Sequence, residues 1–314
     1  MNHQPGFTFT KPGFLSLLQD GGRRGVMHMG LATGGAMDRH AWAWANRLLG
    51  NAYGTAALEI TFGGVEFISQ LDTQISITGA EVECHINGEH RALWSVINLK
   101  TGDHVTLSAP KSGVRAYLAV LGGFQVKPGL GNSCATFTRE GTGGLHLDGH
   151  PLAAGDHLPC GSNAHTVPNR KVSEQWRPDY RDELELSVIP GAQIARFPAA
   201  VLETFFSQPY TLTPQTDRMG ARLKGPALEV IGKTLISEGT SLGAIQVPSD
   251  GQPILLLNDR QTIGGYPKLG AVTPRSLDAL AQRTPGTKLQ FRPTTLHEAQ
   301  QEERKFLKFF SIDV

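Results

Sequence analysis

Many short β-like runs separated by turn-forming residues occur along this 314-residue chain, and they constrain its fold more than any other feature. Runs of four to seven residues bounded by Gly, Pro, Asn and Asp are typical of β-strands. With 37 glycines, 19 prolines and only 18% charged residues, the composition favours turn-rich β structure over a helical bundle. The sequence therefore predicts a mainly β protein built from hairpins, as in a barrel or a sandwich. Strands are expected at 73–78, 105–108, 114–120, 184–189, 243–247 and 254–257.

Few segments have the apolar spacing of an amphipathic α-helix. The clearest covers residues 38–49, in which Asp38 stands at the N-cap position and Gly50 follows the last apolar residue. Two further helical patterns cover residues 276–283 and 295–310. We therefore expect a β protein with a few short helices.

The chain is long enough for two domains of about 150 residues each. It also repeats itself weakly, because an Asp-Arg pair precedes an Ala-Leu-Glu sequence in each half, at 38–39 and 57–59 and again at 217–218 and 227–229. We interpret this repeat as an internal duplication. The expected parts are an N-terminal domain over 1–165, a C-terminal domain over 166–314 and a polar linker at about 161–182.

Composition excludes several classes of function. Lys+Arg 29 and Asp+Glu 28 nearly balance, so no excess of positive charge attracts nucleic acid or an anionic membrane. No apolar run approaches the roughly 20 residues that a spanning helix needs. The N-terminus has neither the basic nor the apolar region of a secretory signal. We therefore expect a cytoplasmic protein with no nucleic-acid or membrane partner.

The usual metal and nucleotide motifs are not found either. The three cysteines are odd in number and far apart, which predicts reduced thiols rather than disulfides or a zinc site. The Gly-Lys-Thr sequence at 232–234 lacks the first glycine of a P-loop. No metal is expected. Three histidines in a Gly- and Asp-rich turn are interpreted as solvated loop residues: His146, His150 and His157.

Residues 258–268 combine acidic, basic and amide side chains with Gly264-Gly265 and Pro267. They follow the apolar run 253–257, which is predicted to be a buried strand. Glycine lets the main chain come close to a ligand, so this arrangement is typical of a site for a polar small molecule. A charged hairpin turn is the alternative interpretation.

Asp38-Arg39 and Asp217-Arg218 each place a carboxylate beside a guanidinium. The arginine fork binds carboxylate or phosphate through paired hydrogen bonds, and a carboxylate can orient that fork or act as a base. Such pairs also serve as structural braces. The functional hypothesis is that groups from both halves line one crevice for an anionic small molecule.

Six blocks follow one another along the chain: 19–23, 35–38, 57–61, 115–123, 217–220 and 258–267. Together they resemble the biotin-dependent carboxyltransferase-like family, and within it the C subunits of prokaryotic ATP-dependent 5-oxoprolinases. The resemblance covers about residues 10–300. It implies two tandem cyclophilin-like β-barrel domains. Arg260 and Ile263 depart from residues that are common in the family.

The resemblance implies a hydrolase of a cyclic amide that works only in a complex. A C subunit of this kind acts with a separate A subunit, and with a cyclophilin-like B subunit, to open 5-oxo-L-proline to L-glutamate with ATP hydrolysis. ATP is the expected cofactor, bound by this chain, by its partner or at a site that the two share. The small-molecule substrate is an amide or lactam.

The site hypothesis gives each predicted residue a role in that reaction. Arg39 or Arg218 clamps a substrate carboxylate or a phosphate, and Asp38 or Asp259 acts as a base or orients such a clamp. Lys268 neutralises developing negative charge. The predicted catalytic residues are Asp38, Asp217, Asp259 and Lys268. The predicted substrate-binding residues are Arg39, Arg218, Arg222, Gln246, Gln261, Gly264, Gly265 and Tyr266.

Two other functions fit the same resemblance. One is a biotin-dependent carboxyltransferase that moves a carboxyl group from carboxybiotin to urea or a similar amide. This chain has no Met-Lys-Met-type biotin attachment sequence, so the biotin carrier would be another chain or domain. The other is a non-catalytic regulatory protein that binds a B-type partner.

Overall fold

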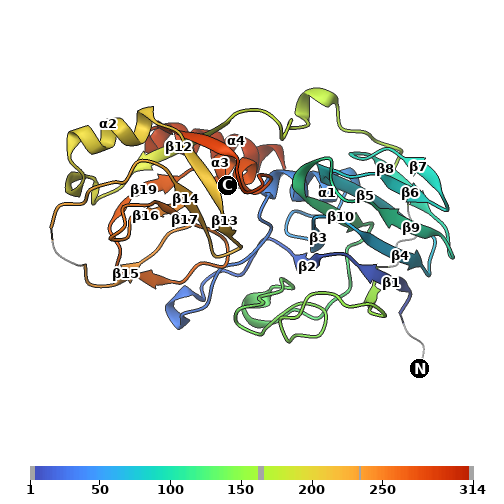
Figure 1. Cartoon of the computed structure of the whole chain (residues 1–314). Helices are drawn as coiled ribbons and strands as arrows, with labels where there is room; N and C mark the ends of the chain where they lie inside the picture. The colour runs from blue at the N-terminus through green and yellow to red at the C-terminus, as the bar shows by residue number, and fades with distance from the viewer. Residues whose placement is uncertain (1–3, 162–165, 233–234, 311–314) are drawn as a thin grey trace. The chain divides into compact units, whose positions relative to one another are not determined.

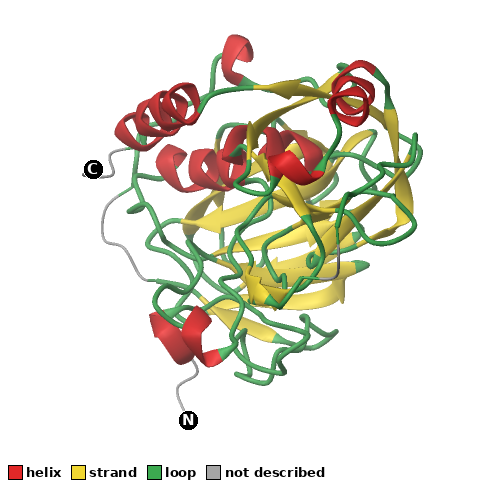
Figure 2. Cartoon of the chain, turned by 90° about the vertical axis from the view of Figure 1, so that its left-hand side faces the viewer, coloured by secondary structure: helices red, strands yellow, loops and turns green. Residues whose placement is uncertain are grey.

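The computed structural model describes residues 4–161, 166–232 and 235–310, and it divides into two compact units (Figure 1). The first unit holds Met1–Arg24 and Gly34–Arg181, and the second holds Gly25–Thr33 and Asp182–Val314. Strands and loops make up most of the chain, with few helices (Figure 2). The prediction of a mainly β fold is confirmed. Two predicted features, residues 162–165 of the linker and Lys233-Thr234 of the rejected P-loop, lie outside the described residues.

The first unit contains two antiparallel sheets. All six predicted strands of the chain are present, with ends that differ by at most three residues. In sheet order, the six-stranded sheet consists of β11 (His157–Pro159), β1 (Gly6–Pro12), β4 (Val65–Ser69), β9 (His104–Leu107), β6 (Cys84–Ile86) and β7 (Glu89–Arg91). The five-stranded sheet consists of β2 (Leu15–Gln19), β3 (Ala57–Thr61), β10 (Ser112–Val120), β5 (Thr73–Glu81) and β8 (Val96–Leu99).

One apolar core is shared by these two sheets. The six-stranded sheet contributes Phe7 and Phe67, whose rings lie 4.7 Å apart, and the five-stranded sheet contributes Ile77 and Leu118. Strand β10 is apolar along most of its length rather than in alternation, and both of its faces are buried. The reason is that helix α1 (Arg39–Leu48) packs on β10 and β5 from the side opposite the core.

Helix α1 confirms the clearest helical prediction of the sequence. The side chain of Asp38 caps it by accepting a hydrogen bond from the Ala41 main-chain N–H at 2.9 Å. Trp42 and Leu48 are buried on the packed face. Thr78 of β5 donates its hydroxyl to the Ala41 carbonyl at 2.7 Å, so polar residues on the strand also fix the helix.

The second unit is a closed barrel. Parallel pairing of its first and last strands, with Leu184 opposite Leu289, joins the ends of the sheet. In barrel order the strands are β12 (Leu184–Pro190), β19 (Lys268–Val272), β16 (Ala244–Gln246), β17 (Ile254–Leu256), β14 (Gly220–Lys224), β13 (Tyr210–Thr216) and β20 (Lys288–Pro293). A small separate sheet pairs β15 (Glu238–Gly239) with β18 (Ile263–Gly264).

Three α-helices belong to the second unit: α2 (Ala199–Ser207), α3 (Pro274–Leu280) and α4 (Leu296–Phe309). The ends of α3 and α4 lie within three residues of their predicted positions, whereas α2 was not predicted. Helix α2 packs on β20, where Phe205 stacks on Phe291 with ring centroids 4.3 Å apart. Four short 3₁₀ helices complete the described chain: η1 (Met27–Met29), η2 (Leu130–Asn132), η3 (Glu174–Trp176) and η4 (Ile194–Arg196).

The three cysteines are free, as predicted for reduced thiols. Cys84 and Cys160 are buried, and Cys134 is half-buried. Burial raises the pKa of the Cys84 thiol to about 12, so this group stays protonated at neutral pH. Among the described residues, no helix is both long and apolar enough to cross a membrane.

Helix α4 depends on a reciprocal cap. Thr295 accepts a hydrogen bond from the Glu298 main-chain N–H, and the Glu298 carboxylate accepts one from the Thr295 N–H.

Thr295→Ala removes one of these bonds, and we expect the free energy of unfolding to fall by about 1 kcal/mol, measured by urea denaturation. Thr284→Ala is the matched control, because Thr284 is exposed and its hydroxyl makes no hydrogen bond within the described part of the chain. An equal loss in both variants would contradict the role of the cap.

Candidate functional site

The predicted motif at 258–268 leaves the barrel at the end of β17 and returns to it at β19. Main-chain hydrogen bonds tie this loop to the Asp-Arg pair of the same unit. Leu257 donates to the Met219 carbonyl at 2.9 Å, and Asp259 donates to the Arg218 carbonyl at 2.8 Å. Two motifs that lie about forty residues apart in sequence are therefore adjacent in the second unit.

Arg218 and Asp259 form a buried, bidentate ion pair. Arg218 Nε lies 2.8 Å from one Asp259 oxygen, and Nη2 lies 3.0 Å from the other. The two residues are only 8% and 5% exposed. Both carboxylate oxygens are thus committed to the guanidinium, so the geometry favours Asp259 as the residue that orients Arg218 over its alternative role as a base.

Arg260, the next residue, is buried without such a partner. It is 4% exposed, and its guanidinium contacts the Thr33 hydroxyl at 3.2 Å, the Thr240 and Leu257 carbonyls at 3.4 Å and the Met27 sulfur at 3.8 Å. In the described part of the chain, no acidic side chain pairs with it. Burial lowers the pKa of Arg260 below its ordinary value, because a charge removed from water is destabilised. An anion bound here would offset that cost.

Gln246 and Gln261 form an amide pair beside Gly264. Gln246 is 1% exposed, and its Oε1 accepts a hydrogen bond from Gln261 Nε2 at 3.3 Å. The Gln246 Nε2 group is buried and has no hydrogen-bond partner among the described residues. A Cβ atom at Gly264 would lie only 2.5 Å from that nitrogen, so the absence of a side chain there gives the amide its space. An unpaired buried donor in a native structure requires an explanation, and a ligand acceptor is one.

Lys268 stands at the start of β19 with its charge partly compensated. Its Nζ lies 2.7 Å from Glu238 Oε1, and its main-chain N–H donates to Gln193 Oε1 at 2.8 Å. The hydrogen bond and charge of Lys268 lower the pKa of the Glu238 carboxyl. The lysine side chain is 12% exposed while that of Glu238 is 52% exposed, so the lysine is the more enclosed partner. Tyr266 nearby in sequence is half exposed.

Two other predicted residues of the second unit have local roles. Asp217 is exposed, and its carboxylate accepts hydrogen bonds from the main-chain N–H groups of Met219 and Gly220 at 2.7 and 3.0 Å. It therefore shapes the turn before β14. Arg222 is exposed and lies 3.9 Å from a carboxylate oxygen of Asp250.

Asp38 and Arg39 belong to the first unit, at the start of α1. Besides capping the helix, the Asp38 carboxylate accepts a hydrogen bond from the Tyr180 hydroxyl at 3.3 Å. The Asp38 main-chain N–H donates to the Tyr117 hydroxyl at 2.8 Å, and that hydroxyl donates to Glu59 at 2.7 Å. Burial, then the charges of Glu59 and Asp38, raise the pKa of Tyr117. The crevice lined by both halves stays a prediction.

Sequence reasoning missed the contributions of Thr33, Gln193 and Glu238 to this region, and it did not give Arg260 a role. Their participation depends on chain pairings that no local motif encodes. Among the described residues, no group of three or more His, Cys, Asp or Glu side chains is arranged to hold a metal ion.

Comparison with known proteins places this chain in a family. The family described as "carboxyltransferase domain, subdomain A and B" matches residues 29–293. The chain belongs to this carboxyltransferase domain family. It is 35% identical over 303 residues to the C subunit of 5-oxoprolinase from Escherichia coli, covering 96% of this chain and 95% of that protein. It is 34% identical over 298 residues to the C subunit of 5-oxoprolinase from Haemophilus influenzae, covering 92% and 91%.

A solved structure has the same fold as this chain. The crystal structure of Kluyveromyces lactis urea carboxylase matches with a TM-score of 0.91 and 27% identity. The match covers 99% of this chain but 29% of the urea carboxylase chain. This chain therefore corresponds to one part of that larger protein.

The contrast between the two buried arginines gives a test of the site. Arg218→Met leaves the Asp259 carboxylate buried and unpaired, so we expect the free energy of unfolding to fall by about 3–5 kcal/mol. Arg260→Met instead removes a buried charge that has no acidic partner in the described chain, and we expect a loss below about 1 kcal/mol, or a gain. Urea denaturation measures both. Similar large losses in the two variants would mean that Arg260 is a structural brace.

Proposed function

We propose that this chain is the C subunit of an ATP-dependent 5-oxoprolinase, which acts with a B-type and an A-type subunit to open 5-oxo-L-proline to L-glutamate. The observation that carries the proposal is the similarity to the C subunit of the Escherichia coli 5-oxoprolinase over nearly the whole of both chains. The urea carboxylase match has lower identity and spans a minor part of that protein.

The proposed chemistry sets requirements for the site. A five-membered lactam resists hydrolysis because its nitrogen donates electrons into the carbonyl. Transfer of the ATP γ-phosphoryl group to the lactam oxygen releases ADP and makes the ring carbon electrophilic. Water then attacks that carbon and the C–N bond breaks, which frees the amine and leaves an acyl phosphate. A second water hydrolyses the acyl phosphate to the carboxylate of glutamate and free phosphate. The protein must therefore bind a carboxylate, an amide and a phosphoryl group away from bulk water.

Arg260 is the proposed anchor for the anionic group, either the substrate carboxylate or the transferred phosphoryl group. Its guanidinium is already removed from water and has no acidic partner in the described chain. A bound anion therefore gains a strong contact without displacing a carboxylate of the protein. The Arg218–Asp259 pair fixes the main chain directly before it. Arg260 thus takes the role that the sequence assigned to Arg39 or Arg218.

The lactam amide is proposed to meet the Gln246–Gln261 pair beside Gly264. Gln246 Nε2 is a donor without a partner among the described residues, which suits an amide oxygen. Lys268 supplies positive charge near the same loop, held by Glu238. In this proposal Asp38 and Asp217 position α1 and the turn before β14, and Arg222, Gly265 and Tyr266 keep their predicted contacts with substrate. ATP is bound here or shared with the partner.

Carboxyl transfer to urea or a similar amide is the second candidate. The fold match to urea carboxylase favours it, and the same amide pair would then face the ureido ring of biotin. Because this sequence has no Met-Lys-Met-type attachment sequence, the biotin would arrive on another chain or domain.

Reconstitution separates the two candidates. The chain is co-expressed with candidate A and B subunits, and glutamate release from 5-oxo-L-proline is measured with and without ATP. We expect glutamate only when ATP and all subunits are present. In the same complex, Arg260→Met should raise KM for 5-oxo-L-proline by about tenfold or more, because one charged contact is lost. No glutamate, together with carboxylation of urea from bicarbonate and a biotin carrier, would support the second candidate instead.

Two glycines of the same small sheet provide a matched test of the amide pair. Gly264→Ala places a Cβ against Gln246 Nε2, whereas Gly239→Ala, on the paired strand, meets nothing within 4 Å. We expect Gly264→Ala to lower kcat/KM of the reconstituted complex by about tenfold, since a displacement of the amide costs a contact with the substrate. Gly239→Ala should keep normal activity. Equal activity of both variants would remove the amide pair from the site.

A further inference from the structure

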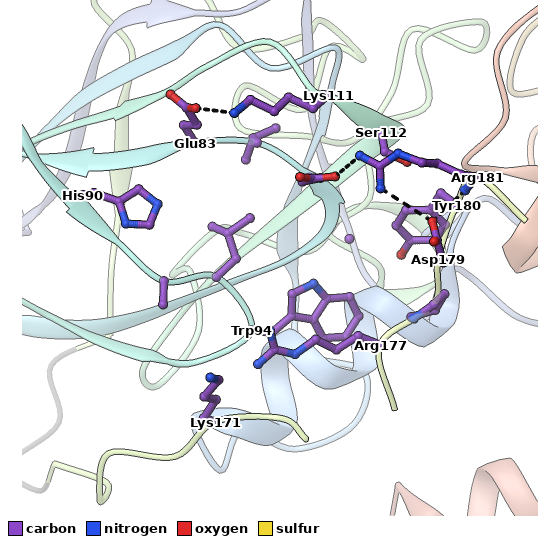
Figure 3. A pocket seen from close by; sticks show the side chains of 16 residues that line it. Glu83, His90, Trp94, Lys111, Ser112, Lys171, Arg177, Asp179, Tyr180 and Arg181 are labelled. Carbon is purple, nitrogen blue, oxygen red and sulfur yellow. Dashed lines mark hydrogen bonds and ion pairs between the residues drawn. The ribbon is translucent and has the colours of Figure 1, made fainter. Parts of the chain in front are cut away.

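A pocket of about 450 Å³ opens in the first unit, and none of its lining residues is among those proposed for the lactam site (Figure 3). Its volume lies within the range of small-molecule sites. One wall comes from the ends of β5 and β10 and from the segment before β8. The other wall is the segment 171–181, which closes the first unit.

The segment 171–181 is fixed to the strands along its length. The Val172 main-chain N–H donates to the Trp94 carbonyl at 2.8 Å, and Lys171 pairs with Ser95 as an isolated β-bridge. Tyr180 packs where a Cβ atom at Gly113 would lie 2.8 Å from its ring, so this glycine makes room for the wall. The pocket is therefore a built feature of the unit rather than a gap under a loose loop.

Trp94 forms part of the pocket in a strained conformation. Its φ is 57°, in the left-handed region that bulky side chains rarely adopt. Such a conformation is energetically costly and is found most often at binding sites and active sites. The residue is 6% exposed, and its indole ring faces the pocket beside Arg177 (Figure 3).

The acidic side chains of the pocket are already paired with bases. Glu83 lies 2.5 Å from Lys111 Nζ, and Arg181 binds both Glu81 and Asp179 (Figure 3). A cationic ligand would therefore have to break an existing ion pair.

Among the basic residues that line the pocket, Lys171 and Arg177 have no acidic partner in the described part of the chain. Arg177 donates Nε and Nη2 to the Val172 carbonyl at 3.0 and 2.7 Å, which fixes its fork and leaves Nη1 uncommitted. Lys171 lines the pocket together with Arg177. Figure 3 shows both side chains on the Trp94 side of the pocket.

We propose that this pocket binds a small organic anion. The phosphate or carboxylate group of the ligand is held by Lys171 and Arg177, and its planar or apolar body lies on Trp94. A free inorganic ion would fill only a small part of 450 Å³, so an organic body is required. This proposal does not depend on the oxoprolinase assignment.

Isothermal titration calorimetry of the full chain tests the pocket with four probes: phenyl phosphate, benzoate, inorganic phosphate and benzyl alcohol. We expect heat of binding with phenyl phosphate or benzoate, weaker binding of inorganic phosphate and none of benzyl alcohol. The better of the two aromatic anions identifies the ligand class as phosphate or carboxylate. Lys171→Gln should weaken binding of that anion about tenfold, because one charged contact is lost.

Lys127→Gln is the matched control, since Lys127 is an exposed lysine of the same unit outside the pocket. Its affinity for the aromatic anions should equal that of the unaltered chain. The proposal is overturned if the unaltered chain binds neither phenyl phosphate nor benzoate at millimolar concentration. It is also overturned if both lysine variants weaken binding equally, because the anion would then be attracted by surface charge in general.

Discussion

The buried pair of Arg218 and Asp259 is the interaction on which the loop after β17 depends. A guanidinium and a carboxylate removed from water are each costly, and their two parallel hydrogen bonds offset that cost only in one relative position. The pair therefore fixes residues 257–259 beside 218–219. Arg260 follows immediately, and its side chain lies in the interior, where it contacts Thr33 and Leu257.

The Arg218–Asp259 pair and Arg260 are neighbours, but their buried charges are compensated differently. In the pair, positive charge is cancelled inside the protein. At Arg260 the contacts are a hydroxyl, two carbonyls and a thioether, all of which are neutral. The same contrast recurs in the described part of the first unit, where the pocket's acidic side chains are paired while Lys171 and Arg177 have no acidic partner. Charges left uncompensated by the fold are the ones that a ligand can use.

Much of the fold could be predicted because its signals are local. Alternating or continuous apolar runs predicted the strands, and the Asp38 cap with the following apolar face predicted α1. Helix α2 was missed because it has no side-chain cap, and its packing depends on Phe291, more than eighty residues away. The closed barrel likewise rests on the pairing of β12 with β20, about a hundred residues apart.

The roles of individual charged residues were less accessible to sequence reasoning. Asp38, Asp217 and Asp259 each precede an arginine in the sequence. Asp259 forms its buried ion pair with Arg218 rather than with Arg260, the arginine that follows it. Asp38 caps a helix, and Asp217 shapes a turn. The environment of Arg260 also depends on residues 25–33, which precede it by more than two hundred positions but belong to the same unit. One cut in the gene between codons 181 and 182 would therefore not yield two complete halves. A fragment beginning at Asp182 would lack Met27 and Thr33, and water would reach the guanidinium that the intact chain keeps covered.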